Sequence, residues 1–499
     1  MSVVDTVSKK TFVPGKLNTG KALAALERQI EKDLEILAYP EKEWIPPTVR
    51  PDGTKVLDVV VVGAGHCGVA ATFALMRERV NNILAIDENP IGCEGPWLTY
   101  AQMPTLRTRK TVTGMELGFP NLNFRSFYEA RNGEEAYAKL DKITCEEWVD
   151  YMLWMRRVLG LPVQNETRMT LLEHDGTMFR LSVDHKGKKE TLYARRVVLS
   201  GGPYSTGGPN IPAPVKAGLP KSHYAHVAEM VDFTKLKGKK VLVVGAGASA
   251  FDNAGSALDH GAASLDLILR RPKIPRLAMI RWTDWSGFMY TLADLPDPEK
   301  WRVMLEVQRN HAPPPMTAIR RVEKYPNFAI HFSSPIEEAT LKDGKVHLRT
   351  PKQTHVVDYV LLGTGYSFDF AGTKELGDIG PKIAVWADRY TPPPEVRNPE
   401  RYQASPYLGR NFEFTEKVPG TAPYLKHLFN FNQSATVSMG PTGRVSGLKY
   451  GVRRLAAGVV GSFFREDVEK HLATALVYDD SEIEGHPWAE TSPFKKAKG

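Results

Sequence analysis

The chain has 499 residues, of which 42% are hydrophobic and 24% are charged. These values are close to the average of globular proteins, and they exclude a disordered chain, a collagen-like fibre and a disulfide-stabilised miniprotein. The length predicts two or three domains. The net charge of +8 would suit an anionic partner such as nucleic acid, but there is no long basic block, so an ordinary basic enzyme is favoured.

The three cysteines, Cys67, Cys93 and Cys145, form neither a C-x-x-C pair nor a zinc-type spacing. We therefore expect no redox-active dithiol, no disulfide framework and no metal site. The first residues contain no apolar segment typical of a secretory signal. Apolar runs such as Val59–Val62 are much shorter than the ~20 residues that span a bilayer. We expect a soluble, cytoplasmic protein that binds neither membranes nor nucleic acid.

An amphipathic helix is expected within residues 1–54, before the first strongly patterned segment. Leucine and isoleucine recur there three to four positions apart, with lysine and glutamate on the other face. We expect the helix to pack on the following domain or across a dimer interface, and the oligomeric state stays open. The apolar positions are Leu23, Leu26, Ile30, Leu34 and Leu37.

Two segments of the chain, residues 55–90 and 237–272, share the same sequence pattern. Each copy has a β-branched apolar run, a glycine-rich turn, an alanine-rich helical stretch and a second apolar run, which predicts a βαβ unit. The turns read GAGHCG at residues 63–68 and GAGASA at residues 245–250. Such a turn lets the start of a helix present backbone N–H groups to a pyrophosphate, so both units are predicted to bind dinucleotides.

The two units differ where their second strand ends. The first ends on Asp87 and Glu88, and carboxylates there accept hydrogen bonds from ribose hydroxyls and repel a 2′-phosphate. The second ends on Arg270 and Arg271, whose guanidinium groups pair with a 2′-phosphate, although a solvated strand end is the alternative. The first unit is therefore predicted to bind FAD and the second NADPH.

Further motifs, in this order, resemble those of the class B flavin monooxygenases. IGCEGPW at 91–97 resembles a G-G-x-W stretch whose tryptophan packs near the flavin. VVLSGG at 197–202 and PNIP at 209–212 resemble the A-T-G…P-x-I-P crossover between domains. DYVLLGTGY at 358–366 resembles a D-x-x-x-[L/F]-A-T-G-Y element, with Gly363 in place of alanine. The family includes flavin-containing, Baeyer–Villiger and N-hydroxylating monooxygenases, and the absent C-x-x-C separates the chain from related disulfide reductases.

Two positions depart from the family pattern. His226 stands where the family fingerprint F-x-G-x-x-x-H places its histidine, but Pro220, Ser222 and Met230 replace the other signature residues. A surface or hinge role for His226 therefore stands beside a functional one. Arg107 lies where relatives place a small polar residue near the flavin. It is a candidate catalytic residue that would stabilise a flavin peroxide anion or a substrate carboxylate, and a phosphate or surface contact is the alternative.

The resemblance implies an α/β fold with two Rossmann-like dinucleotide-binding domains, the NADP domain being inserted into the FAD domain. We expect the strand at Val356–Leu362 to return to the FAD domain. The expected parts are an N-terminal helical extension at 1–54, the FAD domain at 55–220 and 351–480, the NADP domain at 221–350, and a loose tail at 481–499. The candidate cofactor-binding residues are Gly63, Gly65, His66, Cys67, Gly68, Asp87, Glu88, Trp97, Gly245, Gly247, Ser249, Arg270, Arg271 and Gly365.

Two other segments are candidates for the active site. The aromatic run at 281–290 would line a substrate pocket or, as we prefer, pack at a domain interface. The segment GPTG at 440–443 precedes a helical stretch at Leu448–Val460. By analogy with the family, the start of that helix would face the flavin, where its dipole favours the negative charge of the reduced ring; a capped structural helix is the alternative.

The resemblance implies a monooxygenase that uses FAD, NADPH and O₂. NADPH would reduce the flavin, O₂ would form a C4a-(hydro)peroxide on it, and one oxygen atom would pass to an amine nitrogen or a sulfur of a small molecule. Three alternatives stay open: an NADPH oxidase or reductase without oxygen transfer, a Baeyer–Villiger enzyme, and a non-catalytic dinucleotide-binding protein.

Overall fold

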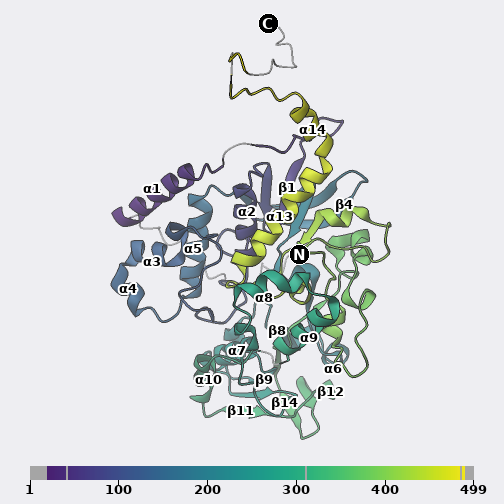
Figure 1. The fold of residues 1–499 in the computed structure, drawn as a ribbon. Coiled ribbons are helices and arrows are strands. Elements are labelled where there is room, and N and C mark those ends of the chain that lie inside the picture. Colours follow the sequence, from purple (N-terminus) through teal and green to yellow (C-terminus); the bar gives the residue numbers. More distant parts are fainter. Residues whose placement is uncertain (1–19, 41–42, 310–311, 484–485, 489–499) are drawn as a thin grey trace.

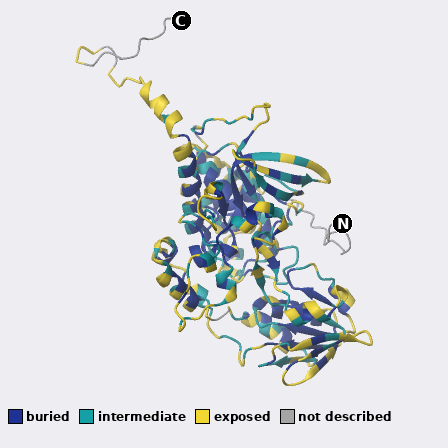
Figure 2. Ribbon diagram, turned by 90° about the vertical axis from the view of Figure 1, so that its right-hand side faces the viewer, coloured by how far each residue is buried: buried dark blue, intermediate teal, exposed yellow. Residues whose placement is uncertain are grey.

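The computed structural model describes residues 20–40, 43–309, 312–483 and 486–488. Its elements form two sheet-centred units, one above the other in Figure 1, with the described helices around them. Buried residues gather in both sheets, and exposed residues lie on the helices and hairpins outside them (Figure 2). The α/β fold with two Rossmann-like units is confirmed.

The first unit is built on a seven-stranded sheet in the order β3-β2-β1-β6-β5-β4, with β17 paired to β6. Strand β1 runs parallel to both β2 and β6, and Val59–Val61 are fully buried, as expected for a central strand covered on both faces. Strands β4, β5 and β6 are antiparallel. The strands are β1 (Leu57–Val62), β2 (Ile83–Ile86), β3 (Val163–Gln164), β4 (Thr167–His174), β5 (Phe179–His185), β6 (Lys188–Leu199) and β17 (Leu428–Asn430).

Helices α2 and α13 pack against each other beside this sheet. On the other side of α2, helix α1 packs on α3 and α5, and Leu23, Ile30 and Leu34 are buried. The indole Nε1 of Trp154 donates to Glu27 Oε1 at 3.0 Å, which fixes α1 to α5. The expected packing of the N-terminal helix on the first domain is confirmed. The helices are α1 (Lys21–Ile36), α2 (His66–Arg77), α3 (Phe124–Asn132), α4 (Glu134–Lys139), α5 (Cys145–Val158) and α13 (Leu448–Glu466).

The second unit has a parallel five-stranded sheet in the order β11-β10-β9-β15-β8, with α7 and α10 packed together beside it. A three-stranded antiparallel sheet, β12-β13-β14, adjoins it and carries α6. The elements are α6 (Ala213–Gly218), β8 (Tyr224–His226), β9 (Lys240–Val244), α7 (Ala248–Asp259), β10 (Ser264–Ile268), α10 (Met316–Glu323), β11 (Phe328–His331), β12 (Glu338–Lys342), β13 (Lys345–Arg349), β14 (Thr354–Val357) and β15 (Tyr359–Leu362).

The strand expected to return to the FAD domain belongs to the second sheet instead. Within Val356–Leu362, β15 pairs with β9 and β8, and Val360–Leu362 are fully buried there. The prediction of a return at this strand is therefore wrong, because an apolar run shows that a strand is buried but not which strands it pairs with. Among the described residues, the chain rejoins the first sheet at β17.

A short antiparallel ribbon connects the two units. It consists of β7 (Gly207–Pro209), which meets the expected PNIP crossover at Pro209, and β16 (Tyr366–Phe368), which begins at the end of the DYVLLGTGY element; this ribbon is the crossover between the units. Gly207 has φ +142°, and a Cβ there would lie 2.5 Å from Ser367 O. Only glycine therefore allows strands β7 and β16 to approach this closely.

Helix α8 (Ser286–Thr291), which follows the second glycine turn in the chain, packs against α13. Phe288 and Met289 are buried, as the expected packing role requires, whereas Trp282 and Trp285 are about half exposed. Near the C-terminus, α14 extends away from the body without a buried residue (Figures 1 and 2). Of the expected loose tail, 481–483 and 486–488 are exposed and the rest lies outside the described residues. The helices are α8 (Ser286–Thr291), α9 (Asp297–Val307), α11 (Glu400–Gln403), α12 (Thr436–Met439) and α14 (Val468–Leu476).

Within the part of the chain that the structure describes, no helix combines the length and apolar character needed to cross a bilayer.

Candidate functional site

The first glycine turn joins β1 to α2, and the backbone packs so closely there that it leaves no room for a Cβ at Gly63 or Gly68. A Cβ at Gly63 would lie 2.7 Å from Ser200 C, and one at Gly68 would lie 1.8 Å from Gly63 O. Gly63 also has φ +99°. Gly65 precedes α2, and no side chain caps its first N–H groups. These N–H groups are therefore free of side-chain acceptors at the position where a pyrophosphate would bind.

Asp87 lies next to this turn, and Glu88 does not. Asp87 is 6% exposed, and its Oδ2 accepts a hydrogen bond from Ala64 N at 2.8 Å. Burial raises the pKa of Asp87. The Glu88 side chain is 58% exposed and lies 3.7 Å from the Arg168 guanidinium. Of the two predicted ribose ligands, only Asp87 is thus placed beside the glycine turn.

His66 and Cys67 hold a distant loop against the start of α2. His66 Nε2 lies 3.1 Å and Cys67 Sγ 3.3 Å from the carbonyl oxygen of Gly443. Burial lowers the pKa of His66 and raises that of Cys67 to about 12, so both side chains are neutral. The loop at 440–447 is therefore tied to the first glycine turn.

Trp97 packs beside the first glycine turn. Its ring centroid lies 5.7 Å from that of His66 and 6.1 Å from that of Trp148. The indole Nε1 is buried and has no hydrogen-bond partner among the described residues. A buried N–H without an acceptor costs free energy, which a bound group would recover. This orphaned N–H, the glycine cradle and Asp87 fit a flavin dinucleotide.

The second glycine turn joins β9 to α7. Gly245 has φ +126°, and a Cβ there would lie 2.4 Å from Gly363 O. Gly247 faces open space, since no atom lies within 4 Å of its Cβ position. No side chain caps the start of α7, and Ser249 is exposed there. The open side of Gly247 is where the backbone would approach a pyrophosphate.

Arg270 and Arg271 follow β10 beside this turn. Arg270 is exposed, and burial together with Arg270 and Arg397 lowers the pKa of Arg271. Among the described residues, no carboxylate pairs with Arg270 or Arg271. Uncompensated guanidinium groups at this position fit the 2′-phosphate of NADP. Gly365 lies further away, in the crossover, where its carbonyl oxygen accepts from Asn210 N at 2.9 Å.

Arg107 lies where the two units meet. Its Nη2 is 2.8 Å from Oδ2 of Asp252, which belongs to α7 and has a side chain only 5% exposed. Nearby, Ser256 Oγ donates to Gln102 Oε1 at 3.1 Å. The stretch before and around Arg107 thus attaches the first unit to the helix that starts at the second glycine turn.

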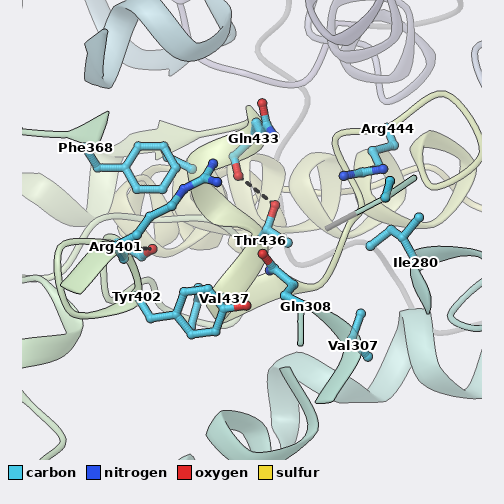
Figure 3. A pocket seen from close by; sticks show the side chains of 13 residues that line it. Ile280, Val307, Gln308, Phe368, Arg401, Tyr402, Gln433, Thr436, Val437 and Arg444 are labelled. Atoms are coloured by element: carbon cyan, nitrogen blue, oxygen red, sulfur yellow. Dashed lines mark hydrogen bonds between the residues drawn. The ribbon is translucent and has the colours of Figure 1, made fainter. Parts of the chain in front are cut away.

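A cavity of about 140 Å³ lies beside the loop at 440–447 (Figure 3). Two arginines that sequence analysis missed, Arg401 of α11 and Arg444, extend into it. They come from segments without a recognisable motif, although Arg444 directly follows the GPTG segment. Other lining residues are Gln308, Phe368, Gln433 and Thr436.

His226 is fully buried in β8, so a surface role for it is wrong. Its Nδ1 accepts from Ala228 N at 3.2 Å, and its ring lies 5.7 Å from that of Tyr366. Burial lowers the pKa of His226 to about 4, and the ring is neutral at physiological pH. The position next to the crossover is compatible with a hinge role.

Comparison with known proteins identifies the family. Residues 60–276 match the model of the pyridine nucleotide-disulphide oxidoreductases. A FAD-dependent urate hydroxylase from Xanthomonas campestris pv. campestris is 40% identical over 467 residues, which cover 93% of this chain and 98% of that enzyme. The chain belongs to the flavin-dependent monooxygenase family of that enzyme. The predictions of a flavin monooxygenase and of an oxidoreductase are thereby confirmed.

Solved structures of flavin monooxygenases share the fold. Ornithine hydroxylase from Pseudomonas aeruginosa has a TM-score of 0.63 at 17% identity, covering 82% of this chain and 99% of its own. L-lysine 6-monooxygenase from Pseudomonas syringae has a TM-score of 0.58 at 16% identity, with coverages of 82% and 99%. The likeness extends over both units of this flavin monooxygenase.

Proposed function

We propose that this flavin monooxygenase uses FAD and NADPH to add one oxygen atom from O₂ to urate. The substrate is suggested by the urate hydroxylase, which is 40% identical and is matched over 98% of its length. Urate is a flat, nitrogen-rich heterocycle. It replaces the amine or sulfur compound expected from sequence as the first substrate to test.

The observation that carries the proposal is the convergence of both glycine turns on one group of arginines. The loop at 440–447 is tied to the first turn through Gly443. Arg444 of this loop lies close enough to Arg107 for the charge of Arg107 to lower the pKa of Arg444. Arg107 in turn pairs with Asp252, which belongs to the helix after the second glycine turn. Two dinucleotides bound at these turns would meet at this point.

When bound, FAD supplies hydride acceptance and activation of O₂. The protein's own contribution is to position and shield. The first glycine turn and Asp87 would hold the FAD dinucleotide, the second turn with Arg270 and Arg271 would hold NADPH, and Trp97 would pack beside the flavin. The arginines near Arg107 supply positive charge where negative charge develops on reduction.

The test begins with the visible spectrum of the purified protein, in which bound FAD is expected. NADPH oxidation under air is then followed with and without urate, together with hydrogen peroxide and with the mass of the product made under ¹⁸O₂. We expect urate to accelerate NADPH oxidation, to lower peroxide release and to gain one labelled oxygen atom. Panels of amines, thioethers and ketones serve as comparison substrates.

Three outcomes would contradict the proposal. Peroxide formation that is equal with and without urate would indicate an oxidase. Oxygenation of an amine or a thioether but not of urate would restore the substrate class expected from sequence. A protein that cannot be loaded with FAD would refute the proposal as a whole.

A further inference from the structure

We propose that Arg401 and Arg444 form the anion-binding part of the substrate site, where they hold a flat, negatively charged heterocycle. This inference rests on the proposed function and specifies which residues recognise the substrate. Arg401 belongs to α11, and Arg444 to the loop between α12 and α13. Figure 3 shows the two side chains pointing toward one another from opposite sides of the cavity.

The two guanidinium groups carry uncompensated charge. Among the described residues, neither has a carboxylate partner, whereas Arg107 is paired with Asp252. Burial lowers the pKa of both Arg401 and Arg444, and their mutual proximity lowers that of Arg444 further. Two like charges held close together inside a protein are unfavourable unless an anion lies between them.

Arg444 is exposed and lines the cavity. Burial nevertheless lowers its pKa. The guanidinium is therefore placed for a ligand rather than for bulk solvent. Its planar fork can donate two parallel hydrogen bonds to neighbouring acceptors on one edge of a ring.

The rest of the lining favours a flat heterocycle over a phosphate. The Arg401 guanidinium carbon lies 5.1 Å from the centroid of the Phe368 ring, which offers an apolar surface next to the charge. Gln308, Gln433 and Thr436 add neutral groups that both donate and accept hydrogen bonds. A urate anion combines these features, because its ring is flat, its carbonyl oxygens accept and its N–H groups donate.

Equilibrium binding to the FAD-loaded enzyme tests the inference without turnover. Urate and hypoxanthine, a neutral purine, are titrated anaerobically by calorimetry into the wild type and into Arg401→Gln, Arg444→Gln and the double variant. Each single substitution is expected to weaken urate binding about 10- to 100-fold, because a charge-assisted hydrogen bond is lost. Arg444→Lys should recover part of the affinity, since lysine keeps the charge but not the fork.

Hypoxanthine provides the test of charge. Its binding should weaken much less than that of urate in the same variants, because it presents no negative charge to the arginines. Arg410→Gln is the matched control: this side chain is 76% exposed and lies outside the cavity, and urate affinity should stay within about twofold of the wild type. The flavin absorbance of each variant reports whether it is folded and loaded with FAD.

The outcomes separate this inference from the proposed function. If the wild type oxygenates urate while both arginine variants bind it as tightly, the inference is wrong and the function stands. If urate binds through the arginines without being oxygenated, the function is wrong and the inference stands. A wild type without urate binding would overturn the inference.

Discussion

Gly363 and Ala250 lie so close together that only one of them has room for a methyl group. A Cβ on Gly363 would be 2.7 Å from the Cβ of Ala250 and 3.0 Å from Val244 O. Ala250 occupies the third glycine position of the second turn, and Gly363 occupies the alanine position of the D-x-x-x-[L/F]-A-T-G-Y element. Two departures that look independent in the sequence thus compensate each other where β15 passes the start of α7.

The first prediction tests this compensation. Gly363→Ala should destabilise the protein by about 1–3 kcal/mol because the added methyl group overpacks the contact. Adding Ala250→Gly should restore part of the loss, the remainder reflecting the contact with Val244 O. Thermal unfolding of both single variants and the double variant measures this coupling. Gly461→Ala, whose nearest neighbour is the end of the Arg465 side chain, is the control. A double variant less stable than Gly363→Ala would contradict the prediction.

The pair between Arg107 and Asp252 is expected to hold the two units together. Arg107→Gln leaves the 5%-exposed Asp252 carboxylate without its partner and should lower stability by about 1–3 kcal/mol. Combining it with Asp252→Asn should cost less than the sum of the two single changes. Arg168→Gln, which removes pairs on the exposed surface, should change stability by less than ~0.5 kcal/mol. Simple additivity of Arg107→Gln and Asp252→Asn would argue against a direct interaction.

The specificity for NADPH should depend on Arg270 and Arg271. Replacing both by alanine is expected to raise the KM for NADPH about 10- to 100-fold and to change that for NADH little, because only NADPH carries the 2′-phosphate. Steady-state oxidation of both nucleotides by the FAD-loaded enzyme measures the effect. Lys352→Ala, an exposed charge change elsewhere in the second unit, is the control. Equal losses with the two nucleotides would refute the assignment.

Asp266 is predicted to contribute stability that disappears in acid. Hydrogen bonds from His355 Nδ1 at 2.9 Å and from His331 Nε2 at 3.1 Å lower the pKa of Asp266, that from His355 most. When folding lowers the pKa of a carboxylate, its contribution to stability is complete above the pKa of the unfolded state, which is ~4. This contribution is lost as the pH falls through the pKa of the folded state.

Asp266→Asn should therefore be less stable than the wild type near pH 7, and the difference should shrink below about pH 4. Thermal unfolding between pH 3 and 7 measures it, with Asp378→Asn, an exposed aspartate, as the control. A deficit that grows as the pH falls would have the wrong sign and would rule out this role for the carboxylate.

Local patterns were sufficient for much of the fold. The glycine spacing at 63–68 and 245–250 indicates both turns because each strand, turn and helix is contiguous in the chain. The spacing of Leu23, Ile30 and Leu34 indicates the buried face of α1 for the same reason. The turn conformation and the spacing of buried positions both depend on residues that are close together in the chain. The sequence therefore shows these patterns directly.

Long-range packing decided the rest. No local signal shows that β15 joins β9 and β8, that His226 is buried against the crossover, or that Gly363 faces Ala250. Arg401 and Arg444 converge in one cavity from a short helix and a loop, which only the folding of the whole chain brings together. The sequence therefore indicates two dinucleotide sites, because their chemistry resides in contiguous turns. The proposed substrate site emerges only from tertiary structure, because its charges come from separate segments.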